Sequence, residues 1–297
     1  MKQLNKLLTL LVLTLFVNLL NAQNTDYQQS LQEYRNQNYE KADLLVNNAI
    51  VYFKNKNLTD SIAMAYLHKA DIAWVAEGNY QALEVIDIAI SYSNELTGKN
   101  LAKVAVYNKK GQILVNISRF REGIIYLQKA LEYIPPDKAN SSIVAKLYTD
   151  LSWYYLTQDD FNPAMQYARQ SLNIQEEIFG KDARQLMGAL QSISLIAHGA
   201  GDFKVAEEYA LELLRIASMH LEKTHPTMGL VHNGLGTIYE SSQQYEKALY
   251  HFGEMMRIMQ ADYQLHGNPQ MSAIAYNNTA MLYESTGEYT LAESYSE

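Results

Sequence analysis

The sequence contains no cysteine among its 297 residues. Disulfide bonds, thiol catalysis and thiolate metal sites are therefore excluded, as is a lipid anchor attached to an N-terminal cysteine. With 48% hydrophobic and 19% charged residues, the composition is typical of an ordered helical array and not of a disordered chain. Stability must then come from packed apolar faces alone.

The chain also lacks an excess of basic residues. It has 24 Lys and Arg against 32 Asp and Glu, a net charge of −8, and it contains no basic run. Nucleic-acid binding depends on neutralising phosphates with Lys and Arg. We therefore expect no nucleic-acid partner.

Motifs that carry enzyme chemistry are missing as well. There is no His-Glu-x-x-His, no pair of histidines at helical i, i+4 spacing, no Gly-rich phosphate loop and no Gly-x-Ser-x-Gly. Among the seven histidines, His232 falls at a core-facing position of the repeat described below, so we expect it to pack and not to bind a metal. We expect no catalytic residue, no metal and no cofactor in this chain.

Residues 1–22 differ from the rest of the sequence. Two lysines precede an apolar stretch over residues 7–17, and Ala22 offers a small residue at a cleavage point. This order is typical of a secretory signal peptide. The alternative is a retained membrane anchor, but a span needs about 20 apolar residues, and Asn18 and Asn21 interrupt this one. We predict an exported protein, periplasmic or secreted, with no stable membrane insertion after cleavage.

Two rows of residues recur through the remaining chain at a period of about 42 residues. The anchors of the first helix of each hairpin are Tyr66, Tyr107, Tyr148, Leu190, His232 and Tyr276. The aromatic residues that open each second helix are Tyr39, Tyr80, Phe120, Phe161, Phe203, Tyr245 and Tyr289. Tyr66 and Tyr80 are 14 residues apart, whereas the two rows are 13 apart in the other hairpins. Ala82 nevertheless keeps the common 16-residue distance from Tyr66, so we expect Tyr80 to lie one place off its row and no residue to be inserted.

Small residues recur with the same period, where two helices must approach closely. In first helices they are Ala70, Gly111, Ser152, Ser194, Gly236 and Ala280. In second helices they are Ala42, Ala82, Gly123, Ala164, Ala206, Ala248 and Ala292. A large side chain there would hold the helix axes apart, so we predict that these residues are buried between helices. No β-strand pattern is present.

The clearest copy of the repeat spans His225 to Ile258. Its landmarks are an aromatic ring, Leu-Gly-x-x-Tyr and Ala-x-x-x-Phe, carried by His232, Leu235, Gly236, Tyr239, Tyr245, Ala248 and Phe252. This order resembles the tetratricopeptide repeat. The resemblance implies an all-α fold of helical hairpins stacked in a right-handed α-solenoid superhelix.

The period is longer than the 34 residues of the common tetratricopeptide repeat. The joints at residues 221–226 and 265–269 resemble those of kinesin light chain, and equally those of bacterial repeat arrays that precede a CHAT-type, caspase-like peptidase domain. The resemblance is clear over residues 179–297 and looser over residues 26–178. The sequence departs from the pattern of these families at Leu190 and the residues that follow it. Some bacterial sensor kinases also carry a repeat array behind a signal peptide.

We predict a single repeat domain, residues 23–297, with about seven hairpins and no linker. Prolines at positions 135, 136, 226 and 269 fall between hairpins, where a residue that cannot continue a helix is useful. The second helix of the last copy has reached only residues 289–297, so this hairpin is incomplete. We therefore expect a fragment of a longer protein, and we expect the open C-terminal hairpin to offer a surface for oligomerisation.

In arrays of this kind, first helices line a concave wall that holds peptides or partner helices. The residue after each anchor, and the residue four positions later, should face that wall. These rows predict a peptide-binding groove formed by Asn108, Gln112, Trp153, Gln191, Asn233, Thr237 and Asn277. Amide side chains offer both a donor and an acceptor to a peptide backbone. The alternative is a solvated helix face without a ligand.

The leading hypothesis is an exported helical-repeat scaffold that binds a protein or peptide through its concave face, without catalysis. The alternative is the N-terminal regulatory or substrate-presenting array of a larger enzyme, a CHAT-type peptidase or a sensor kinase, whose catalytic domain lies beyond residue 297. A third hypothesis is purely structural, with stacking into larger assemblies through the last hairpin.

Overall fold

The computed structural model describes residues 25–266 and 269–296. Within these residues it contains fourteen α-helices, two short 3-10 helices and no strand, so the predicted all-α fold is confirmed. None of the described helices has both the length and the apolar character needed to cross a membrane. The predicted signal peptide, residues 1–22, lies outside the described residues and stays a prediction.

The helices form two compact units, which we describe separately. Unit 1 includes residues 25–158 and 173–178, and unit 2 includes residues 159–172 and 179–296. The helices of unit 1 are α2 (Thr25–Arg35), α3 (Tyr39–Asn55), α4 (Thr59–Ala76), α5 (Asn79–Glu95), α6 (Leu101–Asn116), α7 (Phe120–Glu132), η1 (Pro136–Lys138) and α8 (Ser142–Leu156). Helix α9 (Phe161–Phe179) is divided between the units. The helices of unit 2 are η2 (Arg184–Leu186), α10 (Met187–Gly199), α11 (Phe203–His220), α12 (Pro226–Ser241), α13 (Tyr245–His266), α14 (Pro269–Thr286) and α15 (Tyr289–Ser296).

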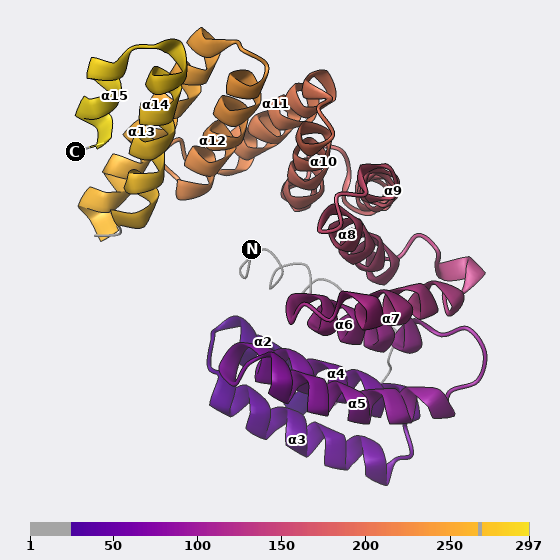
Figure 1. Ribbon diagram of the computed structural model, residues 1–297. Coiled ribbons are helices and arrows are strands. Elements are labelled where there is room, and N and C mark those ends of the chain that lie inside the picture. Colours follow the sequence, from indigo (N-terminus) through magenta and orange to yellow (C-terminus); the bar gives the residue numbers. More distant parts are fainter. Residues whose placement is uncertain (1–24, 267–268, 297) are drawn as a thin grey trace. The chain divides into compact units, whose positions relative to one another are not determined.

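Consecutive helices pack as hairpins in both units (Figure 1). In unit 1, α2 packs on α3, α4 on α5 and α6 on α7, and the first helices α4, α6 and α8 are neighbours. In unit 2, α10 packs on α11, α12 on α13 and α14 on α15. The described residues therefore contain six packed helix pairs, and α8 and α9 are divided between the units. The single repeat domain over residues 23–297 stays a prediction.

The aromatic row marks the start of each second helix, as the sequence predicts. Six of its members are the first residue of a helix: Tyr39, Phe120, Phe161, Phe203, Tyr245 and Tyr289. Tyr80 is instead the second residue of α5 and is 75% exposed, which confirms that it lies one place off its row.

The turn before each second helix contains one residue with a left-handed backbone. These residues recur with the period of the repeat: Gln37, Gly78, Ser118, Asp159, Gly201, Gln243 and Gly287. Glycine adopts this conformation without a steric cost, whereas other residues pay about 1 kcal/mol or more. The turns at the four non-glycine positions therefore depend on the packing of the flanking helices.

The small residues lie between helices, as predicted. The alanine and serine members of both rows are almost completely buried. A Cβ atom on Gly111 would lie 2.7 Å from Leu127 Cδ2 and 3.0 Å from the carbonyl oxygen of Gly123, and one on Gly236 would lie 2.5 Å from Phe252 Cδ1. Larger side chains are therefore excluded where the helices of a hairpin meet.

Candidate functional site

The predicted groove residues belong to one face of the first helices. We call this surface the first-helix face, and it contains the residues two before, one after, two after and five after each anchor. These four positions lie within about 100° of one another around a helix with 3.6 residues per turn. Helices α4, α6 and α8 form the first-helix face of unit 1, and α10, α12 and α14 form that of unit 2.

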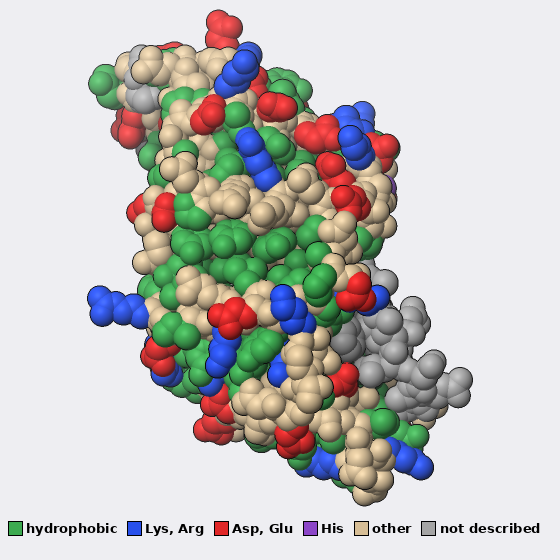
Figure 2. Space-filling model, turned by 90° about the vertical axis from the view of Figure 1, so that its right-hand side faces the viewer, with side chains coloured by type: hydrophobic (Ala, Val, Ile, Leu, Met, Phe, Trp, Pro, Cys, Tyr) green, Lys and Arg blue, Asp and Glu red, His purple; other side chains and the backbone are tan. Residues whose placement is uncertain are grey.

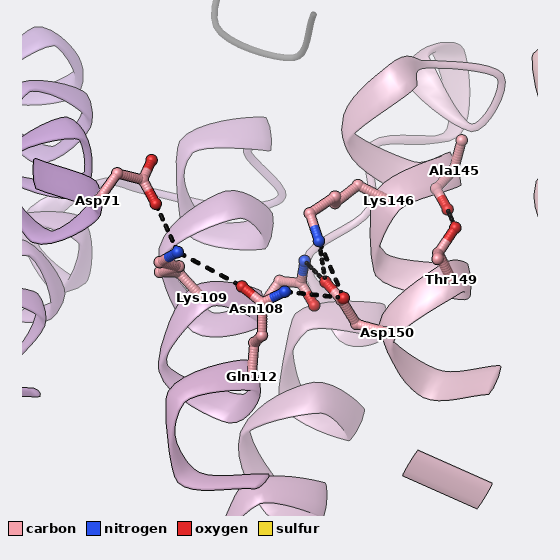
Figure 3. Close-up of polar contacts among 8 residues, drawn as sticks. All are labelled: Asp71, Asn108, Lys109, Gln112, Ala145, Lys146, Thr149 and Asp150. Atoms are coloured by element: carbon pink, nitrogen blue, oxygen red, sulfur yellow. Dashed lines mark hydrogen bonds and ion pairs between the residues drawn. The ribbon is translucent and has the colours of Figure 1, made fainter. Parts of the chain in front are cut away.

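In unit 1, the first-helix face is a buried polar network centred on Asp150 of α8 (Figure 3). Lys146, one turn earlier on α8, places its Nζ 2.9 Å from both carboxylate oxygens. From α6, Asn108 Nδ2 donates to Oδ2 at 2.8 Å and Gln112 Nε2 donates to Oδ1 at 3.1 Å. Asp150 thus accepts hydrogen bonds from two helices, which is what a buried carboxylate requires.

A second ion pair joins α6 to α4. Lys109 Nζ lies 2.5 Å from Asp71 Oδ1, donates to Gln112 Oε1 at 3.4 Å, and sits 3.8 Å from the centre of the Trp74 ring. Burial lowers the pKa of Lys109, and the charge of Asp71 opposes this change. Asp71 Oδ2 and Asn108 Oδ1 are buried without a hydrogen-bond partner in the part of the chain that the structure describes. The network therefore joins three first helices and leaves two acceptor atoms unused.

A serine and a histidine meet beside this network, but they do not form a catalytic pair. His68 Nε2 lies 3.0 Å from Ser30 Oγ, and Ser30 Oγ also donates to the carbonyl oxygen of Ala42 at 2.6 Å. Both side chains are fully buried, and His68 Nδ1 has no hydrogen-bond partner among the described residues, so no carboxylate orients the ring. Burial lowers the pKa of His68 to about 4, so the imidazole is neutral at pH 7.

In unit 2, the first-helix face is open and carries exposed apolar side chains. Leu195 of α10 is 49% exposed, Leu230 of α12 is 43% exposed, and Ile274 and Met281 of α14 are 44% and 53% exposed. Gly234 of α12, one turn after Leu230, is also exposed. The face of unit 2 is thus accessible to a partner, unlike that of unit 1.

Hydrogen bonds join the first helices of unit 2. His198 Nε2 of α10 lies 2.8 Å from Ser241 Oγ of α12. Asn278 Nδ2 of α14 donates to Asn233 Oδ1 of α12 at 2.6 Å. These two bonds connect α10 to α12 and α12 to α14, whereas the main packing contacts of α12 are with α11 and α13.

The two faces differ in charge. Helices α10, α12 and α14 contain only two charged residues, Glu240 and Glu284, and both lie in the last turn of their helix. Helices α4, α6 and α8 carry charged side chains at Asp60, Lys69, Asp71, Lys103, Lys109, Lys110, Lys146 and Asp150. At the second position after the anchor, the three first helices of unit 1 carry His68, Lys109 and Asp150, whereas those of unit 2 carry Ser192, Gly234 and Asn278.

The predicted groove residues therefore fall into two groups. Asn108 and Gln112 lie buried in the unit 1 network, and Trp153, on the same face, is 37% exposed. The members in unit 2 lie on the open face, where Gln191 and Asn277 are exposed and Asn233 and Thr237 are half-buried. A role of these seven residues in peptide binding stays a prediction.

Sequence reasoning missed two of the four positions that make the face. The positions two before and two after the anchor supply Lys146, Asp150 and Lys109 in unit 1 and Leu230 and Gly234 in unit 2. The spacing i, i+4, i+7 of Leu230, Gly234 and Thr237 was the signal available in the sequence.

His232 packs in the core of unit 2, as its repeat position predicts. Its Nδ1 lies 2.9 Å from Nδ1 of His251 on α13, and both rings are buried. The ring of Tyr239 stacks on His251 with centroids 5.4 Å apart. Burial lowers the pKa of both histidines, that of His251 to about 4. Among the described residues, no group of three or more His, Asp or Glu side chains is arranged to hold a metal ion.

Positive and negative side chains are interspersed on the face of the molecule drawn in Figure 2, and neither sign gathers into a patch there. Several surface charges pair with each other, as Arg215 does with Asp182 and Glu212 at 2.7 Å each. The absence of a nucleic-acid partner stays a prediction from the sequence.

Comparisons with known proteins identify the repeat. Two tetratricopeptide repeat family models match the chain, at residues 104–137 and 144–182. A stretch of 102 residues is 28% identical to a Clustered mitochondria protein homolog of Emericella nidulans, covering 34% of this chain and 8% of that protein. The chain thus spans less than a tenth of the length of the curated relatives that it matches.

Solved structures show the same architecture. The TPR-like repeats of a Podosopora anserina kinesin light chain superpose with a TM-score of 0.57 at 13% identity, covering 66% of this chain and 92% of theirs. A Rap protein complexed with competence and sporulation factor superposes with a TM-score of 0.59 at 16% identity, covering 91% of this chain and 74% of its own. At these identities the likeness shows the fold. The chain therefore carries tetratricopeptide repeats and has the helical-repeat fold that they build.

Proposed function

We propose that this tetratricopeptide-repeat scaffold binds a peptide or a peptide-like segment of a partner protein on the first-helix face of unit 2. The observation that carries the proposal is the open surface of α10, α12 and α14. It combines exposed apolar side chains, such as Leu195 and Met281, with the exposed amides of Gln191 and Asn277.

This composition suits a peptide better than a folded surface or a small charged ligand. Amide side chains can donate to and accept from a peptide backbone. Exposed apolar side chains gain free energy when a partner covers them, at about 25 cal/mol per Å² of apolar surface. The Rap protein with a similar fold is complexed with competence and sporulation factor, which supports the use of this fold as a receptor.

A random dodecapeptide library displayed on phage tests the proposal. We expect the unmodified chain to enrich a set of peptides, and a double variant, Leu195→Glu with Met281→Glu, to lose that enrichment. Both side chains are exposed, so the substitutions should leave the melting temperature nearly unchanged.

The matched control alters exposed apolar residues on second helices of the same unit. Leu211 of α11 and Tyr250 of α13 are 43% and 63% exposed. The double variant Leu211→Glu with Tyr250→Glu should retain the enrichment. Equal loss in both double variants would show that the peptides bind elsewhere, and the proposal would then be wrong.

The proposal includes export, which is supported by the order of charged, apolar and small residues in positions 1–22. Mass spectrometry of the N-terminus after expression in a secreting bacterium tests it. We expect a chain that begins near Gln23, and an intact N-terminus in the exported fraction would contradict the prediction.

The alternative function, a regulatory array of a larger peptidase or kinase, is supported by the curated relatives, in which the matching stretch is 8% of the protein. The full-length coding sequence tests it, because that alternative requires a catalytic domain after residue 297.

A further inference from the structure

The absence of charge on the first-helix face of unit 2 restricts what can bind there. A charged ligand side chain covered by this face would lose its hydration, and the only ionised groups on the three helices, Glu240 and Glu284, lie at their ends. An ion that loses water without gaining a partner of opposite charge costs several kcal/mol. Uncharged apolar side chains carry no such cost, and they would cover Leu195, Leu230 and Met281.

Gly234 lies in the middle of this face and is not required by helix packing. A Cβ atom placed on it would meet no heavy atom within 4 Å, whereas one on Gly236, two residues later, would clash with Phe252. Gly236 is thus explained by the close approach of α12 and α13, and Gly234 is not. The missing side chain at 234 exposes the backbone of α12 between Leu230 and Thr237, next to the Asn233 amide.

We propose that the ligand of this face is an uncharged, predominantly apolar peptide segment in an extended conformation, whose main chain crosses α12 at Gly234. This inference rests on the peptide-binding function proposed above and specifies its ligand class and its point of closest approach. A main chain can lie against a helix only where no side chain holds it away, and Gly234 provides that position.

The size of the face sets the length of the segment. Packed helices lie about 8–10 Å apart, and α10, α12 and α14 pack mainly on the second helices between them, so their three axes span at least about 16–20 Å. An extended chain advances about 3.3 Å per residue, so at least about five residues are needed to cover the face. The hydrogen bond from Asn278 to Asn233 connects α14 to α12 next to Gly234.

A synthetic, fluorescently labelled peptide from the phage selection provides the test, with affinity measured by anisotropy. The variants are Gly234→Ala, Gly234→Leu and, as a control, Gly253→Leu. Gly253 of α13 is likewise exposed, with no heavy atom within 4 Å of a built Cβ, but it lies on a second helix. We expect Gly234→Leu to weaken binding at least about tenfold, Gly234→Ala to weaken it several-fold, and Gly253→Leu to stay within about twofold of the unmodified chain.

A scan of the same peptide with aspartate tests the ligand class. We expect a continuous run of about five positions at which aspartate abolishes binding. If peptides bind but Gly234→Leu has no more effect than Gly253→Leu, or if the recovered peptides carry charged residues within the run, this inference is wrong and the binding function stands. If no library peptide is enriched, both fail. If Gly234→Leu leaves the peptide affinity unchanged but alters the particle size on gel filtration, a second copy of the chain occupies the face, and the inference is wrong.

Discussion

The two glycines at 234 and 236 offer a direct test of how the repeat specifies its packing. Both lie inside α12, so an alanine at either position should strengthen the helix by about 1 kcal/mol. At Gly234 nothing opposes this gain, because a new methyl group would meet open space. We therefore expect Gly234→Ala to raise the free energy of unfolding by up to about 1 kcal/mol.

Gly236→Ala should have the opposite effect. Its methyl group would lie 2.5 Å from Phe252 Cδ1 and 3.0 Å from Cζ, well inside the van der Waals distance. The Phe252 ring is fully buried and cannot turn away into solvent. Overpacking of this kind costs about 1–3 kcal/mol, and the severity of the overlap favours the upper end. After subtraction of the helix gain, we expect Gly236→Ala to destabilise by about 2 kcal/mol, and the two variants to differ by about 3 kcal/mol.

Urea unfolding followed by circular dichroism measures both changes. Tryptophan fluorescence reports on unit 1, because the two tryptophans of the chain, Trp74 and Trp153, both lie there. Recorded in the same titration, it shows whether the change in stability extends beyond unit 2. Equal stability of Gly234→Ala and Gly236→Ala would refute the argument that small residues at this period exist for close helix approach.

Three further predictions concern unit 1. Burial lowers the pKa of His68 from 6.5 to about 4, so between these pH values the unfolded chain binds a proton that the folded chain does not. The free energy of unfolding should therefore fall by up to about 3 kcal/mol as the pH falls from 6.5 to 4. Above pH 6.5 this histidine should have no effect on how stability varies with pH. Fluorescence-detected urea titrations at pH 7 and pH 5 measure the fall, and His68→Gln should reduce it; an unchanged slope would contradict the assignment. Asp150→Asn leaves the buried Lys146 charge without its carboxylate and should destabilise unit 1 by about 3 kcal/mol. The double variant Asp150→Leu with Lys146→Met should recover part of this loss. No recovery would mean that the amides bonded to Asp150 dominate the cost. Ser118→Gly relieves a left-handed residue and should stabilise by about 0.5–1 kcal/mol in thermal melts, and a loss of stability would show that the serine side chain supports the turn.

Much of the fold could be predicted because the repeat encodes it several times. A single alanine is uninformative, but a small residue at the same place in seven hairpins specifies where helices meet, and the structure buries them there. The aromatic row also predicted the starts of the second helices, with the displacement of Tyr80 included. The turn residues were harder to predict, because only three of the seven left-handed positions are glycine. At Gln37, Ser118, Asp159 and Gln243, packing of the flanking helices overrides the local backbone preference.

The candidate site was predicted only in part, and the reason is physical. Asn108 and Asn233 occupy the same repeat position, yet Asn108 is buried against Asp150 whereas Asn233 borders an open surface. The repeat position places a side chain on the first-helix face, but the charged neighbours decide whether that side chain is free to meet a partner. The position two after the anchor, which was left out of the prediction, supplies those neighbours in unit 1.

One repeat geometry therefore supports two kinds of surface. In unit 1, the charges of Asp71, Lys109, Lys146 and Asp150 compensate one another within the chain, and removing either member of a pair would leave a buried ion. In unit 2, Gly234 at the corresponding position introduces no charge and no side chain, so the adjacent apolar residues stay uncovered by the protein itself. Substituting the Lys146–Asp150 pattern of unit 1 into α12 of unit 2, with Leu230→Lys and Gly234→Asp, places an i, i+4 ion pair at the equivalent positions. We expect this double variant to keep its helical dichroism and to lose affinity for uncharged peptides, because the new ion pair would have to give up its hydration when such a peptide covers it. Anisotropy with the selected peptide measures the affinity, and retained binding would show that charge on this face does not decide which ligand it accepts.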